Sequence, residues 1–466
     1  MPDVTHAKLQ DRNPGRVRGA WPLEVADERL GNSPGIFVAV GVAHTALVTA
    51  DGNLWTFGAG EDGQLGHYNW ESRRQPTLIR VSSPSPLVPA LESPKRFTSQ
   101  DSLSPNFSPP APIQATGLGG ARVVMVACGE GHTAAVTAAG GLWVWGRGVE
   151  GQLGLSSVQR LNVPTLVDPL LIAGASVAMV ACGRSHTAAV TGSGSLWTWG
   201  LGEHGQLGHG SRATLRAPME VDSELLGGRA ILMVSCGDSH SGAVAEGGGV
   251  YMWGAGAKGR LGLGDLESRL APCQIKLSAF TRGAAGGGGG APARGVMVSC
   301  GGAHTACVTM DEGGARQLWA WGWNKYGQCG VPVRDDLKAP FRLEREALGG
   351  GDVVFVCCGQ AHTAAITLVE RGGGRGQAGG GKVRGGVGGV SGVEGGGRSE
   401  AVEDAVTSVL WSWGKGGAGQ LGFGSDADAG VPAPVTGACM CRRVCVSICV
   451  RACIRARARA CVRVST

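Results

Sequence analysis

The chain has 466 residues, of which 43 % are apolar, 83 are glycine and 15 are cysteine, and its formal net charge is +6 at neutral pH. This length suits one large domain or two smaller ones. No apolar stretch reaches the roughly 20 residues that span a bilayer, and the N-terminal segment lacks the apolar core of a signal peptide. The composition therefore argues against a membrane-spanning chain, and we expect an intracellular protein of the cytoplasm or nucleus.

A sequence unit recurs six times between residues 16 and 436, after a lead-in of residues 1–15 that we expect to be disordered. With small departures, each copy has the turn C-G-x-x-H-T/S, an apolar segment, L-W-x-W-G and then G-x-x-G-Q-L-G. The glycines that end L-W-x-W-G are separated by 88, 54, 54, 68 and 92 residues, and the two steps of 54 have no insertion. Periods of this size are typical of solenoids, propellers and arrays.

Each unit predicts four short β-strands and no helix. The segments that follow the turn, and the L-W-x-W segments, are short, β-branched or aromatic, and bounded by glycine. An apolar run such as 177–181, and before it a proline-led run such as 164–167, precede the turn. Four strands per unit are typical of a propeller blade. Trp143 and Trp145 are two residues apart, so they should share one strand face while Leu142 lies on the other.

The predicted units begin at their proline-led strands, and three insertions interrupt the period. Residues 82–115, 281–294 and 371–398 are rich in Ser, Pro or Gly, which is typical of flexible segments. In an up-and-down blade all three leave from one face, the decorated face, while the C-G-x-x-H turns and the G-x-x-G-Q-L-G loops lie on the opposite, compact face. The predicted starts lie near Pro22, Pro76, Pro164, Pro218, Pro272 and Pro340, and a defective seventh unit starts at Pro432 or Pro434.

The copies resemble the repeat of the regulator of chromosome condensation family, and the segments 58–67 (GAGEDGQLGH) and 182–191 (CGRSHTAAVT) carry the resemblance most clearly. It covers roughly residues 16–436. The resemblance implies an all-β propeller, usually of seven blades. In this chain we expect six blade repeats of about 54 residues plus a defective seventh. Closure as six or as seven blades stays open.

The resemblance also implies a choice of functions. We favour a protein–protein interaction scaffold without enzymatic activity, and the alternative is a guanine-nucleotide exchange factor for a Ran-type small GTPase, which is the activity of the founding family member. Such propellers also occur beside ubiquitin-ligase catalytic domains, but no such domain is present in these residues. A plant ultraviolet-B photoreceptor of similar fold has Trp in a G-W-R-H-T version of the turn. No copy here has that Trp, which argues against photoreception.

The repeated His and Trp residues are interpreted as structural. A zinc site needs about four converging ligands, whereas five of the units offer one Cys and one His and the first offers only the His, so we favour a hydrogen bond that holds the turn over metal binding or catalysis. G-x-G-x-x-G occurs in five copies, but no helix follows it, so a turn with positive φ is favoured over nucleotide binding. The residues in this structural set are His44, His132, His186, His240, His304, His362, Trp55, Trp145, Trp199, Trp253, Trp321 and Trp413.

Function is therefore expected at the variable positions of the compact face. These positions form a predicted ring of mixed charge around the axis, and a solvated rim without a partner is the alternative interpretation. We predict no catalytic residue, no metal and no cofactor, and a protein partner, with a small GTPase as one candidate. The candidate partner-binding residues are Glu61, Asp62, Arg147, Glu150, Arg184, Glu203, His204, Asp238, Lys258, Arg260, Asn324, Lys325, Tyr326 and Gln360.

Residues 437–466 form a low-complexity tail rich in Cys and Arg. Residues 439–466 contain six cysteines and seven arginines but no acidic residue, so the charge of residues 1–438 is +6 − 7 = −1. A near-neutral body argues against nucleic acid as its partner. The tail is interpreted as an unfolded appendage, or as a translated nucleotide repeat standing where a seventh blade would be; binding to anionic surfaces is an alternative. The body cysteines, in apolar strands, are expected to be small core residues rather than a disulfide framework.

Overall fold

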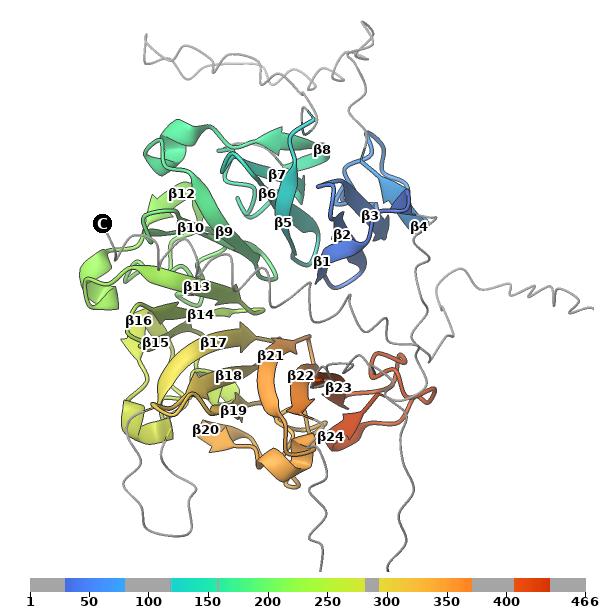
Figure 1. Cartoon of the computed structure of the whole chain (residues 1–466). Helices are drawn as coiled ribbons and strands as arrows, with labels where there is room; N and C mark the ends of the chain where they lie inside the picture. The colour runs from blue at the N-terminus through green and yellow to red at the C-terminus, as the bar shows by residue number, and fades with distance from the viewer. Residues whose placement is uncertain are drawn as a thin grey trace, which may run out of the picture.

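The computed structural model describes residues 30–79, 118, 120–156, 159–280, 293–370 and 406–435. Within these ranges, 24 strands form six four-stranded sheets, and each sheet is an antiparallel meander whose strands lie in chain order. Figure 1 shows the six sheets standing as blades around a central axis. No helix of the described residues is long and apolar enough to cross a membrane. The predicted all-β propeller with six blades is confirmed, and a seventh blade is not among the described residues.

The strand bounds follow the repeat. The first and second blades contain β1 (Gly35–Val40), β2 (His44–Thr49), β3 (Leu54–Gly58), β4 (Arg73–Leu78), β5 (Val123–Cys128), β6 (His132–Thr137), β7 (Leu142–Arg147) and β8 (Arg160–Leu166). The third and fourth contain β9 (Val177–Cys182), β10 (His186–Thr191), β11 (Leu196–Gly200), β12 (Leu215–Glu220), β13 (Ile231–Cys236), β14 (His240–Ala245), β15 (Val250–Gly254) and β16 (Arg269–Gln274). The fifth and sixth contain β17 (Arg294–Cys300), β18 (His304–Met310), β19 (Arg316–Gly322), β20 (Leu337–Arg342), β21 (Asp352–Cys358), β22 (His362–Glu370), β23 (Val406–Gly414) and β24 (Ala429–Pro434). Short 3₁₀ helices are η2 (Pro169–Ile172), η3 (Ser223–Leu226), η4 (Ala257–Gly259), η5 (Leu277–Phe280) and η6 (Arg345–Leu348).

The blades begin one strand later than the repeat predicted. The proline-led strand, expected to open each unit, is instead the outermost strand of the preceding blade: β12, which contains Pro218, pairs with β11. Proline has no N–H to donate to a second neighbour, so the sheet edge is the place that tolerates it. For the same reason β24, which contains Pro432, completes the sixth blade and does not begin a seventh.

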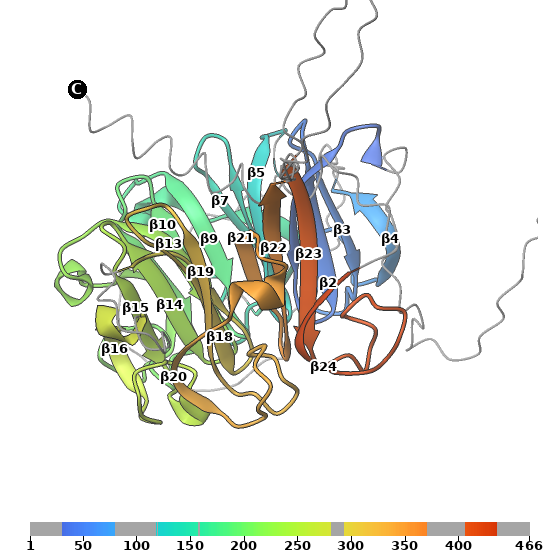
Figure 2. The same cartoon turned by 60° about the horizontal axis from the view of Figure 1, so that its bottom comes forward.

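This shift also moves the predicted insertions. With the blades cut one strand later, residues 82–115 and 281–294 fall between blades, and residues 371–398 fall between the second and third strands of the sixth blade. The described strands on either side of each insertion still meet at one face of the ring, because an antiparallel meander brings the end of its second strand, the start of its third and the end of its fourth to the same end of the blade. Figure 2 shows the blades in a view turned by 60° from that of Figure 1. The predictions for residues 1–15, for the strand at 22–25, for most of the insertions and for the tail at 437–466 lie outside the described residues.

Aromatic and aliphatic side chains fill the spaces between blades. Trp143 and Trp145 pack with Ala46 and Val48 of the first blade, whereas Leu142 packs toward the third blade. This agrees with the prediction that the two tryptophans share one strand face. Each joint between blades is therefore a small apolar core of its own.

A buried relay of hydrogen bonds crosses each joint. His132 Nε2 lies 2.9 Å from Thr187 Oγ1 of the next blade, and Thr187 Oγ1 donates to the Gln152 carbonyl at 2.8 Å. Because the hydroxyl proton points at that carbonyl, His132 Nε2 is the donor to Thr187. Trp199 Nε1 donates to the same carbonyl at 2.9 Å. The other four joints repeat the pattern with His44, Thr133, Gln64 and Trp145; His186, Ser241, Gln206 and Trp253; His240, Thr305, Arg260 and Trp321; and His304, Thr363, Gln328 and Trp413.

The relay differs from the predicted clamp, because it joins two blades instead of holding one turn. At the two ends of the chain it is incomplete. His362 is half-buried and its Nε2 has no hydrogen-bond partner among the described residues. In the first blade the joint position holds Phe57, opposite Thr45, while Trp55 occupies the position of Trp143.

The ring is open between the sixth and first blades in the described part of the chain. The innermost strands contact one another in the order β1, β5, β9, β13, β17 and β21, and no comparable contact joins β21 to β1. Figure 1 shows these two blades on either side of the opening. Closure as six blades is therefore not what these residues form.

Candidate functional site

The C-G-x-x-H turns meet around the axis on the compact face. In four blades the backbone N–H of the residue after C-G donates to a glycine carbonyl of the next turn at 3.2–3.4 Å. These bonds bring the variable residue of each turn to the rim of the axis. The donors are Val42, Arg184, Asp238 and Gly302, and the acceptors are Gly129, Gly237, Gly301 and Gly359.

Four charged side chains of alternating sign follow this rim from the second blade to the fourth. Arg184 Nε lies 3.2 Å from Glu130 Oε2, and both side chains are partly exposed. Burial raises the pKa of Asp238 and nearby Glu130 raises it further, whereas Arg184 and Arg260 oppose the shift. Arg260 donates from Nη1 to the Gly302 carbonyl at 3.4 Å, and burial lowers its pKa. The result is a partly desolvated, nearly neutral charge network at the centre of the compact face.

Glycine at position 302 keeps this centre open. A side chain there would place its Cβ 2.5 Å from the Gln360 carbonyl oxygen and 3.2 Å from Asp238 Oδ2. Such contacts with backbone cannot relax cheaply, so the fifth blade adds no side chain to the rim. Gln360 is exposed on the next turn.

The loops between the third and fourth strands form an outer ring on the same face. Asp62 pairs with Arg160 of the second blade at 3.4 Å, and Lys258 pairs with Asp336 of the fifth blade at 3.3 Å. Both pairs are partly exposed to solvent and contribute little to stability. Of the remaining predicted residues, Glu61, Glu203 and His204 are exposed, while Arg147 and Glu150 are half-buried.

An aromatic cluster interrupts the outer ring at the fifth blade. Trp323 packs edge-on against Tyr326, with ring centroids 5.3 Å apart. Lys325 Nζ and Lys415 Nζ lie 5.9 and 5.2 Å from the centroid of the Tyr326 ring, within the range of a cation–π contact. An amphipathic ring between two cations is the kind of anchor that protein interfaces favour.

The structure places one predicted partner-binding residue elsewhere. Asn324 is fully buried; its Nδ2 donates to the Val333 carbonyl at 2.6 Å and its Oδ1 accepts from Cys329 N. Its amide therefore holds its own loop. Conversely, the prediction omitted Glu130 and Lys415. Both stand at positions where other copies carry predicted residues, Arg184 and Arg147, so an alignment of the copies could have found them.

No three His, Cys, Asp or Glu side chains of the described residues gather as metal ligands. Burial lowers the pKa of His132 to about 3 and raises that of Cys128 to about 12, and the described cysteines are free thiols. Such groups are neutral at physiological pH and are engaged in the joints.

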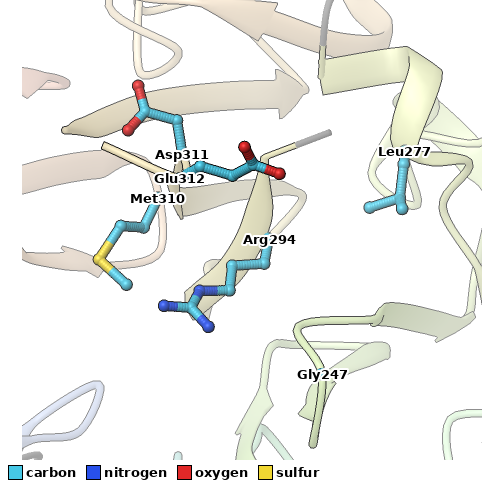
Figure 3. A pocket seen from close by; sticks show the side chains of 6 residues that line it. All are labelled: Gly247, Leu277, Arg294, Met310, Asp311 and Glu312. Carbon is cyan, nitrogen blue, oxygen red and sulfur yellow. The ribbon is translucent and has the colours of Figure 1, made fainter. Parts of the chain in front are cut away.

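A cavity of about 460 Å³ lies on the decorated face between the fourth and fifth blades. Figure 3 shows Asp311 and Glu312 on the hairpin after β18 and Arg294 at the start of β17. Gly247, Leu277 and Met310 complete the lining. The charged lining residues are Arg294, Asp311 and Glu312, and they include no pair of a nucleophile with a base.

Comparison with known proteins agrees with this architecture. The ultraviolet-B receptor UVR8 of Arabidopsis thaliana is 31 % identical over 416 residues, which are 85 % of this chain and 80 % of that protein. The E3 ubiquitin-protein ligase HERC2 of Homo sapiens is 35 % identical over 338 residues, but these cover 68 % of this chain and only 6 % of HERC2. The solved structure of Prp20p from Saccharomyces cerevisiae shares the fold, with a TM-score of 0.57 and 19 % identity over 86 % of this chain and 77 % of that one. Residues 22–367 match the RCC1-like domain. The chain thus belongs to the RCC1-like domain family of β-propellers.

Proposed function

We propose that this protein is a binding module, in which a rigid propeller presents its compact face to a protein partner. The observation that carries the proposal is the separation of roles in the repeat. The repeated His, Thr and Trp residues are buried in the joints, whereas three of the six variable turn residues, Glu130, Arg184 and Asp238, place charged side chains around the axis. Because the repeated residues hold the blades together, we assign partner recognition to the positions that differ between copies.

The chemistry of the axial network favours a protein surface of mixed charge. Glu130 and Asp238 alternate with Arg184 and Arg260, so a polyanion such as nucleic acid would meet repulsion as well as attraction. Asp238 is already partly desolvated, which reduces the cost of pairing it with a cation of the partner. Tyr326 offers an aromatic anchor at the edge of the same face.

A charge reversal on each face tests the proposal. Arg184→Glu puts a carboxylate beside Glu130 and Asp238, while Arg229→Glu makes the same charge change at an exposed site on the decorated face. A partner isolated with the wild-type chain should bind R229E with unchanged affinity. It should bind R184E with an affinity at least about tenfold lower, as expected for a charge close to an interface. Equal affinity of the two variants for the partner would contradict the proposal that the partner binds the compact face.

Exchange of guanine nucleotide on a small GTPase is the second candidate. The solved propeller of Prp20p was analysed for its binding to Gsp1p and histones, and an exchange factor displaces nucleotide without needing an acid–base pair of its own. The assay is release of fluorescent GDP from a Ran-type GTPase with catalytic amounts of this chain. Acceleration that is lost in R184E would support exchange activity; no acceleration by chain shown folded by circular dichroism would reject it for that GTPase.

We do not propose the activities of the other relatives for this chain. The turn position that holds Trp in the G-W-R-H-T motif holds Val42, Glu130, Arg184, Asp238, Gly302 or Gln360 here, which argues against photoreception, and we do not propose it. The match to the ubiquitin ligase covers only a small part of that protein, and ligase activity is not proposed.

A further inference from the structure

Two lysines of the compact face share one aromatic ring. Lys325 Nζ and Lys415 Nζ lie 5.9 and 5.2 Å from the centroid of the Tyr326 ring, and Trp323 packs edge-on against the same ring. Lys325 and Tyr326 lie between the third and fourth strands of the fifth blade, whereas Lys415 follows the third strand of the sixth blade. Because the face of an aromatic ring attracts cations, this ring holds two ammonium groups from neighbouring blades near one place.

A guanidinium group lies across the same joint. A Cβ built on Gly327, the residue after Tyr326, would lie 2.9 Å from Arg334 Nη1, and a Cβ built on Gly430 of the sixth blade would lie 2.9 Å from Arg334 Nη2. The Arg334 side chain therefore lies against the backbone of both blades, and it is exposed to solvent. Together with the two lysines it forms a cluster of three cations at the joint between the fifth and sixth blades.

The three cations of this cluster lack the carboxylate partners that other cations of the compact face have. Arg184 and Lys258 each pair with a carboxylate, at 3.2 and 3.3 Å. Among the described residues, no carboxylate forms an ion pair with a member of the cluster. Of the acids close by in the sequence, Asp335 is exposed and Asp428 accepts a backbone N–H of its own blade. A cation–π contact positions a lysine without neutralising it, so the cluster keeps its positive charge.

The extent of the cluster favours an acidic protein segment over a nucleic acid. A nucleic acid follows a long basic stripe, but the corresponding loops of the first three blades carry Glu61, Asp62, Glu150 and Glu203. These carboxylates would repel a polyanion that extends along the face. A short acidic segment reaches the cluster without meeting them.

We propose that Lys325, Lys415 and Arg334 bind an acidic segment of the protein partner, with Tyr326 as the positioning residue that holds the two lysines. The inference rests on the proposed function of the compact face and adds the chemistry of the partner. Carboxylates of the segment accept hydrogen bonds from the two ammonium groups and from the guanidinium group, and charge assistance makes such bonds stronger than neutral ones.

Protection of lysines from acetylation tests this proposal in the full-length chain. The probe is octaglutamate, and the chain is acetylated with a water-soluble N-hydroxysuccinimide ester and mapped by mass spectrometry. At about ten times its Kd, octaglutamate should slow the acetylation of Lys325 and Lys415 about tenfold, because only the free fraction reacts. Lys276, exposed after β16 of the fourth blade, should react at an unchanged rate. The arginine-rich residues 439–466 contain no lysine, so octaglutamate bound there does not produce this protection.

Matched variants separate the cluster from the rest of the surface. In Lys415→Glu, half-protection of Lys325 should need at least about tenfold more octaglutamate, whereas Arg229→Glu on the decorated face should leave this concentration unchanged. Tyr326→Leu removes the ring that holds the lysines and should raise the concentration about threefold, whereas Tyr326→Phe keeps the ring and should not change it. Circular dichroism spectra that match the wild type show that the variants are folded.

Three results would overturn the proposal. No protection of Lys325, or equal protection of Lys276, would mean that octaglutamate does not select the cluster, and unchanged protection in Lys415→Glu would exclude the cluster as its site. Protection by octauridylate at a lower concentration than by octaglutamate would assign the cluster to a nucleic acid. Each of these results leaves the test of the compact face with Arg184→Glu intact, since that test measures the affinity of the isolated partner.

Discussion

Replacing one buried hydroxyl should weaken a joint by a predictable amount. Thr187→Val keeps the side-chain volume but removes the group that accepts from His132 Nε2 and donates to the Gln152 carbonyl. That carbonyl keeps the Trp199 indole N–H, so the main cost is one buried donor, on His132, left without a partner. An unsatisfied buried donor costs about 1–3 kcal/mol. We therefore expect the free energy of unfolding to fall by about 2 kcal/mol.

The first blade supplies the matched control. Thr45 stands at the same position of the repeat, but its hydroxyl has no His from a preceding blade among the described residues, and it is half-buried rather than fully buried. Thr45→Val should change the free energy of unfolding by less than about 0.5 kcal/mol, as for surface changes away from special contacts. Urea titrations followed by tryptophan fluorescence and by circular dichroism measure both variants. Equal losses of stability in T187V and T45V would refute the relay as the link between blades.

Three further predictions concern the frame and its charges. Burial lowers the pKa of His44 to about 4 and that of His132 to about 3, below the ordinary 6.5, so below pH 6.5 the unfolded chain binds more protons than the folded chain. The free energy of unfolding should therefore fall as the pH falls below about 6.5, by up to about 1.4 kcal/mol per pH unit for each such His. A urea midpoint that does not change between pH 7 and 5 would contradict this. Gly202→Ala places a Cβ against the Ala213 carbonyl and should cost roughly 1–3 kcal/mol, whereas Gly417→Ala, with nothing within 4 Å, should be neutral. Comparable melting temperatures for the two variants would argue against this packing. Arg184→Ala removes an exposed ion pair and should cost less than about 1 kcal/mol of stability while it weakens partner binding, and a large drop in melting temperature would show that Arg184 is structural instead.

The architecture could be predicted well from the sequence because the same pattern of strands and turns occurs in six copies. Glycine turns, period-two apolar segments and the L-W-x-W pair each reflect local chemistry that any copy must satisfy. The boundary between blades was predicted one strand too early, because a repeat shows the order in which the strands recur but not which of them is the first strand of a blade. Pro218 contained the missing signal, because a proline suits an outer edge better than the middle of a blade.

The site was less accessible to sequence reasoning than the frame. Positions on the compact face followed from the meander, yet which of them touch depends on distances between blades. The approach of Glu130 to Arg184, 54 residues away, and the contact of Lys415 with Tyr326 are of this kind. Asn324 was misplaced because a loop asparagine that bonds its own backbone looks in sequence like one that faces solvent.

The central claim is that the compact face binds the partner, and hydrogen–deuterium exchange on the complex tests it most directly. The backbone amides of the turns at residues 129–132, 183–186 and 237–240 should exchange more slowly once the partner is bound. The hairpins of the decorated face, such as 245–250 and 310–316, should exchange as in the free protein. Slower exchange confined to those hairpins, with the turns unchanged, would contradict the account.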